Sequence, residues 1–99
     1  MTAYIVAQLC FKDRVSYDRY QQRFIELFQT CDGMAVIADE SPVVIEGHWD
    51  WEKLVVLSFP DSSSACRFMT SPAYQEISKD RIAGADAVVI LANGLPQNP

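Results

Sequence analysis

One apolar run near the middle of the chain, residues 53–60 (KLVVLSFP), constrains the fold most. It is short, rich in β-branched and aromatic side chains, and closed by a proline. A run of this length and composition is typical of a strand that is buried on both faces, and such strands lie inside a sheet rather than at its edge. The sequence therefore predicts a sheet with this segment at its centre.

Three further segments favour strands. Residues 3–11 carry two largely apolar faces, since successive side chains of a strand point to opposite sides of a sheet. Residues 34–39 form a second strand and residues 85–92 form the last one. Pro42 cannot donate to a strand ladder, so it confines the second strand to a sheet edge. Beyond it, residues 43–46 resume as a short strand or as the far side of a bulge.

The segment after the first strand predicts a helix that runs to about Cys31. Asp13 or Ser16 can cap its start, because a side-chain oxygen at this place accepts a hydrogen bond from an unpaired backbone N–H. Gly33 is placed to end the helix in the left-handed conformation. The buried face of this helix consists of residues at a spacing of three and four: Tyr17, Tyr20, Phe24, Leu27, Phe28 and Cys31.

A second helix is predicted over residues 62–70, with Asp61 as its cap. Ser71 and Pro72 restart it, since serine caps a helix and proline fits the first helical position. Gly84 ends this second part. The inward faces of the two parts consist of Ala65, Phe68 and Met69, and then of Tyr74, Ile77, Arg81 and Ile82.

The elements therefore follow in the order strand, helix, strand, strand, helix, strand. Strand–helix–strand crossovers are right-handed, and two such halves give a ferredoxin-like βαββαβ fold of the α+β class. Its antiparallel sheet carries the helices on one face. We expect a single domain over residues 1–94, followed by a C-terminal tail at residues 95–99 that cannot extend the sheet far.

This fold leaves one face of the sheet without a helical cover. The chain is 49% hydrophobic and 11% aromatic, which is high for a domain of 99 residues. A contiguous apolar sheet face marks an interface, and a two-fold dimer that buries sheet against sheet closes it most simply. The sequence thus predicts a homodimer through the sheet face.

The net charge of −5 argues against a nucleic-acid partner, because scattered lysines and arginines form no patch that would displace phosphate counterions. No apolar run approaches the ~18 residues of a membrane span, so no membrane partner is predicted. The first residues lack the basic region of a secretory signal, and three cysteines without Cys-x-x-Cys spacing suggest no disulfide framework. We expect a cytoplasmic protein.

Residues 47–60 resemble the Gly-x-Trp, apolar run and Phe-Pro pattern of the domain of unknown function family 1330. The likeness continues through Ala65, Phe68, Ser71, Pro72, Ala73, Tyr74, Gln75 and Arg81, and it includes Asp13, Tyr17 and Tyr20 at the opening of the first helix. Arg14 departs from the pattern, since many members carry proline there.

The resemblance covers nearly the whole chain and implies membership of the dimeric α+β barrel superfamily. That superfamily includes cofactor-free monooxygenases, muconolactone-type isomerases, haem enzymes and proteins without an assigned activity. The family itself has no agreed reaction, so the resemblance carries no catalytic residue over to this chain. If the chain is an enzyme, the resemblance implies a cofactor-independent monooxygenase or an isomerase.

His48 is the only histidine and is a candidate catalytic residue. A pKa near neutrality suits it to act as a general base, and it could also be an axial haem ligand. The alternative is a solvated turn residue. A lone histidine lacks the further ligands of a structural metal site, and the chain carries no phosphate loop or dinucleotide fingerprint. We therefore predict no metal and no cofactor.

Trp49 and Trp51 alternate around a turn, with Tyr4 expected nearby. These three side chains could wall a pocket for a flat aromatic molecule. The alternative is that at least one tryptophan caps the sheet or packs on a dimer partner, since aromatic side chains bury large apolar areas in either role.

Arg81 is the second candidate catalytic residue. Its spacing from Tyr74 and Ile77 places it within the apolar face of its helix, which is unusual for arginine. A half-buried guanidinium needs a carboxylate partner or binds an anionic ligand. The candidate protein partners are Asp39, Glu46 and Asp86.

Two functions remain open at this point. The first is the binding or transformation of a small aromatic or carboxylate-bearing molecule in a pocket between sheet and helices. Its ligand-binding residues would be Tyr4, Trp49, Trp51, Tyr74 and Arg81. The second is a non-catalytic dimeric module for structure or interaction. A pocket with convergent polar groups favours the first, and a close-packed interior with a paired Arg81 favours the second.

Overall fold

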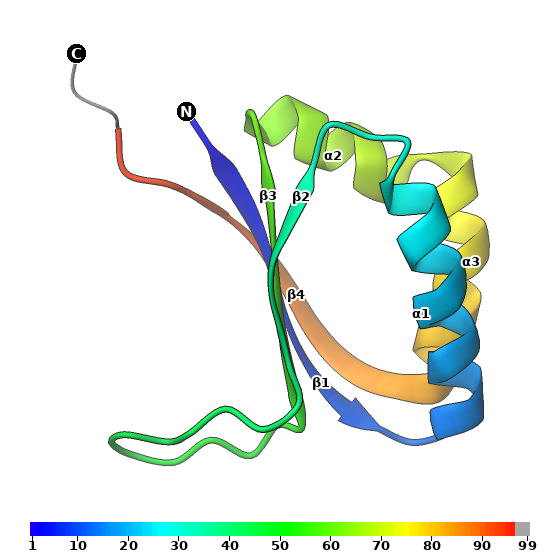
Figure 1. Cartoon of the computed structure of the whole chain (residues 1–99), viewed down its shortest axis with the longest axis vertical. Helices are drawn as coiled ribbons and strands as arrows, with labels where there is room; N and C mark the ends of the chain where they lie inside the picture. Colours follow the sequence, from blue (N-terminus) through cyan, green and yellow to red (C-terminus); the bar gives the residue numbers. More distant parts are fainter. Residues whose placement is uncertain (97–99) are drawn as a thin grey trace.

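The structure is a computed structural model that describes residues 1–96. Its elements are β1 (Ala3–Phe11), α1 (Arg14–Phe28), β2 (Met34–Asp39), β3 (Lys53–Phe59), α2 (Ser62–Thr70), α3 (Pro72–Gly84) and β4 (Ala85–Asn93). The strands form one antiparallel sheet in the order β2-β3-β1-β4, and the helices lie on one side of it (Figure 1). This confirms the ferredoxin-like α+β fold, with β3 inside the sheet and the second helix in two parts.

The predicted C-terminal tail at residues 95–99 falls partly outside the described residues, since positions 97–99 are not among them. Within the described chain, β4 ends at Asn93, and the backbone N–H of Gly94 still donates to the carbonyl of Thr2 at 2.7 Å. None of the helices in residues 1–96 is long and apolar enough to cross a membrane.

Each helix begins at a residue whose side chain accepts from backbone N–H groups of the first turn. Asp13 caps α1, Asp61 caps α2 and Ser71 caps α3. Pro72 occupies the start of α3, where a missing N–H leaves no hydrogen bond unmade. Asp61 and Ser71 were predicted as caps, and of the two candidates for α1, Asp13 and Ser16, the cap is Asp13. Ser71 divides the second helix because it ends α2 while it begins α3.

The end of α1 differs from the prediction. The helix stops at Phe28 rather than near Cys31, and Gly33 does not adopt the left-handed conformation, which among the described glycines occurs only at Gly47. Gly33 is required for space instead. A Cβ atom there would lie 2.8 Å from the rings of Phe28 and Phe59.

Residues 43–46 do not form the predicted strand. They belong to residues 40–52, named here the projecting loop, which extends from the base of the sheet away from the helices (Figure 1). Val43 and Ile45 are 81% and 90% exposed, so this segment has no neighbour against which to pair or pack. The bulge lies within β2 itself, between Ala35 and Ile37, and β2 is an edge strand as predicted.

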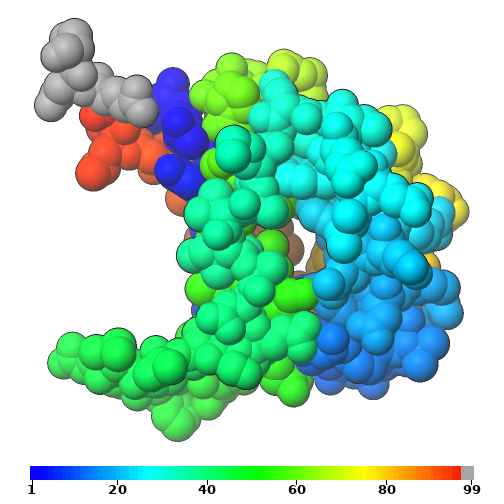
Figure 2. Space-filling view, in the orientation of Figure 1, coloured from blue at the N-terminus to red at the C-terminus, as the bar shows by residue number. Residues whose placement is uncertain are grey.

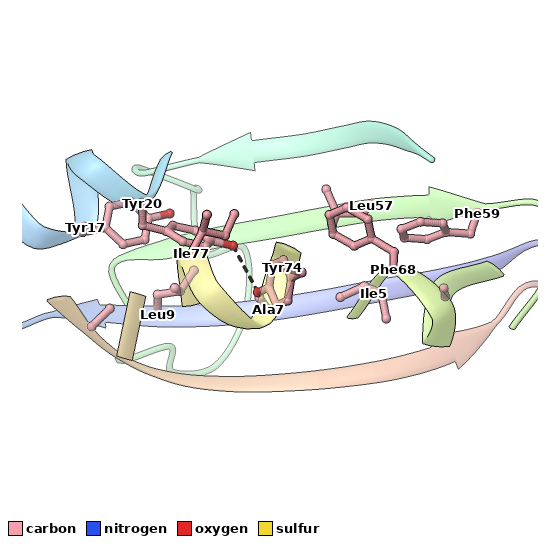
Figure 3. Close-up of a cluster of buried hydrophobic side chains, with 12 residues drawn as sticks. Ile5, Ala7, Leu9, Tyr17, Tyr20, Leu57, Phe59, Phe68, Tyr74 and Ile77 are labelled. Carbon is pink, nitrogen blue, oxygen red and sulfur yellow. Dashed lines mark hydrogen bonds between the residues drawn. The ribbon is translucent and has the colours of Figure 1, made fainter. Parts of the chain in front are cut away.

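The core lies between the helices and the inward face of the sheet (Figure 3). Odd-numbered residues of β1 point inward, and the pairing of Ile5 with Leu57 and of Leu9 with Lys53 places the odd-numbered residues of β3 on the same face. The most deeply buried large side chains are Leu9 and Phe59. From the helices, the core receives Tyr17, Tyr20, Ala65, Phe68, Tyr74 and Ile77.

The opposite face of the sheet, named here the open face, has no helix on it (Figure 1). Tyr4, Val6 and Gln8 of β1 point to it, and the register places Val88 and Ile90 of β4 beside them. Val88 and Ile90 are 46% and 53% exposed. The strands therefore carry apolar side chains on both faces, as the sequence predicts.

One residue of the predicted α3 face is misplaced. Tyr74 and Ile77 are buried, but Ile82 is 59% exposed. Ile82 follows Ile77 by five residues, which carries it past the buried stripe of a helix with 3.6 residues per turn.

Candidate functional site

A cavity of about 190 Å³ lies between α1, α3 and the inward face of the sheet. Its opening lies between β2 and α1, where Figure 2 shows a gap through the surface. The sheet beneath α1 presents three small side chains to it, Ala7, Ala35 and Ala38, which leave space that larger residues would fill. An engineered apolar cavity of about 150 Å³ takes up benzene, so this volume suits one aromatic ring with a small substituent.

Aromatic rings from two helices line the cavity. Tyr17, Tyr20 and Phe24 follow one another along α1 at spacings of three and four, which puts them on the face toward the sheet. Tyr74 of α3 meets this row edge to face, with ring centroids 6.3 Å from Tyr20 and 6.5 Å from Phe24. The walls are therefore rigid and largely apolar.

The hydroxyl groups of Tyr20 and Tyr74 form a buried pair, with their oxygen atoms 3.2 Å apart (Figure 3). Each phenol has one O–H donor, so only one of the two protons is used between them. Within residues 1–96 neither hydroxyl has another hydrogen-bond partner. Burial, and next the neighbouring Tyr74, raise the pKa of Tyr20, so this phenol stays protonated and able to donate.

Lys53 brings a buried ammonium group to the cavity. It is the first residue of β3 and pairs with Leu9, so its side chain points inward and is 5% exposed. The Nζ atom donates to Oε1 of Gln21 at 3.2 Å and lies 4.9 Å from the ring centroid of Tyr17. Oε2 of Glu40 lies 3.7 Å from Nζ, which is within ion-pair distance although it is too long for a hydrogen bond.

Glu40 is held mainly by another cation. Arg14 donates to its two carboxylate oxygens at 2.9 and 3.1 Å, and this bidentate pair lowers the pKa of Glu40. The pair ties the first turn of α1 to the first residue of the projecting loop. Lys53 therefore shares Glu40 with Arg14 as a counter-charge, and within the described chain its ammonium donates one hydrogen bond, to Gln21.

Arg81 reaches the cavity from α3. Its Nε atom is buried and has no hydrogen-bond partner, and among residues 1–96 its guanidinium forms no ion pair. The predicted carboxylate partners lie elsewhere. Asp39 and Asp86 pair with Leu54 and Cys10, which point to the open face, so strand alternation puts them on the wrong side of the sheet.

These carboxylates have other surroundings. Asp86 lies 3.3 Å from the ammonium group of Lys12, and Asp39 accepts from the backbone N–H of Ser41 at 2.8 Å. Glu46 lies in the exposed projecting loop. The prediction of a carboxylate partner for Arg81 among these three residues is therefore wrong.

The lining of the cavity thus combines two cations with no carboxylate. Lys53 and Arg81 are its charged residues, and no aspartate, glutamate or histidine of the described chain lines it. Its other polar groups are the amide of Gln21 and the tyrosine hydroxyls. Chemically, such a lining can hold an apolar body and an oxygen-bearing anion.

The predicted ligand-binding residues separate into two groups. Tyr74 and Arg81 line the cavity, whereas Tyr4, Trp49 and Trp51 lie outside it. Tyr4 is an even-numbered residue of β1 and points to the open face. On that same face, the indole Nε1 of Trp49 donates to Oε1 of Gln8 at 2.7 Å. The structure therefore brings no tryptophan to the cavity.

His48 lies in the projecting loop, where its side chain is 87% exposed and its Nε2 atom is 2.9 Å from the carboxylate of Asp50. This is the surrounding of a solvated loop residue, and it is remote from the cavity lining. Sequence reasoning missed Lys53, Gln21 and Tyr20 as cavity residues. The sequence did carry a signal for Lys53: it is an odd-numbered residue of β3, like the buried Leu57 and Phe59, and alternate residues of a strand point to the same face.

The sequence family described as Domain of unknown function (DUF1330) matches residues 2–95 of the chain. Among curated proteins, none matches it. A protein of unknown function from Rhodopseudomonas palustris has a similar structure, with a TM-score of 0.79 and 16% identity; the match covers 97% of this chain and 84% of that one.

Two further solved structures are similar. A dimeric ferredoxin-like protein of unknown function from Jannaschia sp. has a TM-score of 0.74 at 11% identity, over 95% of this chain and all of that one. A hydroxynitrile lyase from Passiflora edulis has a TM-score of 0.74 at 14% identity, over 99% of this chain and 97% of that one. At these identities, the likeness shows a common fold.

Proposed function

The chain belongs to the DUF1330 family, and we propose that it binds a small aromatic or carboxylate-bearing molecule in the cavity between α1, α3 and the sheet. The observation that carries this proposal concerns Arg81, which lines the cavity and whose buried Nε atom has no hydrogen-bond partner in the described chain. Buried polar groups in proteins are nearly always hydrogen-bonded, so an exception calls for a ligand or water.

The charge of the lining supports an anion rather than a neutral molecule. At an effective dielectric constant of 20, two unit charges 4 Å apart attract by about 4 kcal/mol. A carboxylate that enters the cavity meets the guanidinium of Arg81 and the ammonium of Lys53. The carboxylate of Glu40 lies outside the lining, where it is shared between Lys53 and Arg14. An arginine also matches the two oxygens of a carboxylate with two parallel N–H groups.

The shape of the cavity supports a ligand of one ring. The rings of Tyr20, Phe24 and Tyr74 offer both faces and edges for stacking on an aromatic body. The fold is known to hold an enzyme, since the similar structure from Passiflora edulis is a hydroxynitrile lyase. In this chain no carboxylate or histidine lines the cavity within the described residues, so we propose binding without an assigned reaction.

The test compares benzoate with benzamide, which has the same size and no charge. We expect benzoate to raise the melting temperature with concentration, because a ligand that binds only the folded state stabilises it by about 2.7 kcal/mol at 100 times its Kd. Benzamide should have a much smaller effect. The variant Arg81→Met should lose the response to benzoate, and Arg23→Met, at a surface arginine 49% exposed, should keep it.

If a panel of aromatic and aliphatic acids leaves the melting temperature unchanged at millimolar concentration, the cavity takes no such ligand. The alternative, a non-catalytic dimeric module, would then describe the chain better.

We also propose that the chain forms a homodimer through the open face. The exposed Val88 and Ile90 support this, as do the partly buried Tyr4 and Val6 that lie beside them. Figure 2 shows the open side hollowed between the projecting loop and the end of β4, a shape that suits a second sheet. The similar protein from Jannaschia sp. is dimeric. Sedimentation of a stable 11.1 kDa monomer at micromolar concentration would contradict this proposal.

A cytoplasmic location and the lack of nucleic-acid and membrane partners stay predictions. The net charge of −5 supports the absence of a nucleic-acid partner. The free thiols of Cys10, Cys31 and Cys66 support a reducing compartment.

A further inference from the structure

The cavity presents hydrogen-bond donors that outnumber its acceptors. The Nε–H group of Arg81 has no acceptor, and the tyrosine pair of Tyr20 and Tyr74 leaves one O–H unused. Lys53 has three N–H donors and uses one of them on Gln21. The amide oxygen of Gln21 accepts this bond and keeps one further lone pair. A ligand that satisfies the lining must therefore supply acceptors and few donors of its own.

We infer that the cavity selects the ionised form of weak oxygen acids, namely phenols and enols, and so promotes their loss of a proton. This inference rests on the proposed function, since it concerns the same cavity. A neutral phenol brings an O–H group, for which the lining offers as acceptors only the tyrosine oxygens and the second lone pair of the Gln21 oxygen. A phenolate or enolate oxygen brings only acceptors, and it gains the attraction of the two cations.

The charged and titratable groups around such a ligand come from three elements. Tyr17 and Tyr20 face it from α1, Tyr74 and Arg81 from α3, and Lys53 from β3. The residues of β1, β2, α2 and β4 that line the cavity are apolar. A negative charge lies near this lining, in the projecting loop: the carboxylate of Glu40 is outside the lining, 3.7 Å from the Nζ atom of Lys53, and it is also paired with Arg14. The raised pKa of Tyr20 keeps this phenol neutral in competition with the ligand.

The proton balance of the step is simple. The O–H bond of the ligand breaks, and its electron pair stays on the ligand oxygen. The proton passes to solvent water at the opening between β2 and α1, because the described lining holds no carboxylate or histidine that could accept it. The anion remains in the cavity, and no oxidant, reductant or second substrate takes part.

The experiment uses 4-nitrophenol, whose ionised form absorbs at longer wavelength than its neutral form. A pH titration of the dye, free and with saturating protein, gives the pKa in each state. We expect binding to lower its pKa by about one pH unit or more, which is a tenfold change in the ratio of ionised to neutral dye. Arg81→Met should abolish the shift, Tyr20→Phe should reduce it, and Arg23→Met should leave it unchanged.

The outcomes separate this inference from the proposed function. If benzoate stabilises the protein but 4-nitrophenol does not bind, or binds with an unchanged or raised pKa, the cavity binds acids without selecting ionised phenols and this inference is wrong. If neither compound binds, the proposed function fails as well. A lowered pKa that survives both Arg81→Met and Tyr20→Phe would place the phenolate elsewhere on the protein and would also overturn the inference.

Discussion

Replacing Arg81 with methionine should make the ligand-free protein at least as stable as the wild type. Arginine at this position places a buried N–H without an acceptor in the described chain against an apolar cavity. Methionine keeps an unbranched stem of similar length, so the packing of the aliphatic part against the helix is largely retained. The substitution therefore removes an unfavourable group and few favourable contacts.

The size of the effect follows from the cost of an unsatisfied group. A buried donor without a partner costs about 1–3 kcal/mol. Arg81 is only half-buried as a residue, so we expect the lower end, an increase of about 1 kcal/mol in the free energy of unfolding. For a domain of about 100 residues this raises the melting temperature by about 4–8 °C.

Urea denaturation and thermal melts of wild type, Arg81→Met and the surface control Arg23→Met measure this difference. All three must be compared at one protomer concentration, because the stability of a dimer depends on it. A loss of more than about 1 kcal/mol in Arg81→Met alone would show that the guanidinium has a protein partner in the native state. Arg81 would then not be an unpaired arginine in the ligand-free protein.

Three further predictions concern other parts of the molecule. Gly84→Ala should lower the free energy of unfolding in urea by at least about 3 kcal/mol, because the added Cβ would lie 2.5 Å from a backbone nitrogen of α1, which cannot move aside as a side chain can. Gly33→Ala should lower it by about 1–3 kcal/mol, the usual cost of overpacking, because its Cβ would meet only the edges of aromatic rings. Ile90→Lys on the open face should shift sedimentation toward the monomer, whereas Val15→Lys, at an exposed position of α1, should not. The difference in free energy of unfolding between wild type and Glu40→Gln should shrink when urea denaturation is measured at acid pH. The pKa of Glu40 is lowered in the folded state, so its contribution to stability is fully present above the usual carboxyl pKa and is lost as the pH falls through the folded-state pKa.

The fold was predictable because its signals are local. The caps at Asp13, Asp61 and Ser71 each act within one turn of chain, and strand alternation needs only a few residues. The failure at residues 43–46 has the opposite origin. Three β-branched residues there favour a strand, but a strand forms only where a neighbour offers a ladder, and at the end of an edge strand the described chain offers none.

The lining of the candidate cavity was predictable only in part, for a related reason. Tyr74 and Arg81 were found because helical spacing shows which face they share. The pairing of Tyr74 with Tyr20 joins residues that are 54 positions apart, and no local pattern reports it. Trp49 and Trp51 were misplaced because their positions depend on the path of the projecting loop, which an apolar pattern does not specify.

The alternation of β1 explains why one short strand can serve both proposed roles. Its inward residues Ile5, Ala7 and Leu9 line the cavity, and its outward residues Tyr4 and Val6 form part of the open face. Both faces of β1 need apolar residues, but for different purposes. The inward face leaves room for the proposed ligand, and the open face offers area for contact with a second sheet. The size of the side chains follows this division: Ala7, together with Ala35 and Ala38, leaves room at the cavity, whereas burial of the open face gains from larger groups. Hydrophobicity alone does not distinguish these two demands, which is why an apolar pattern on both faces predicts the strand and the interface but not the cavity.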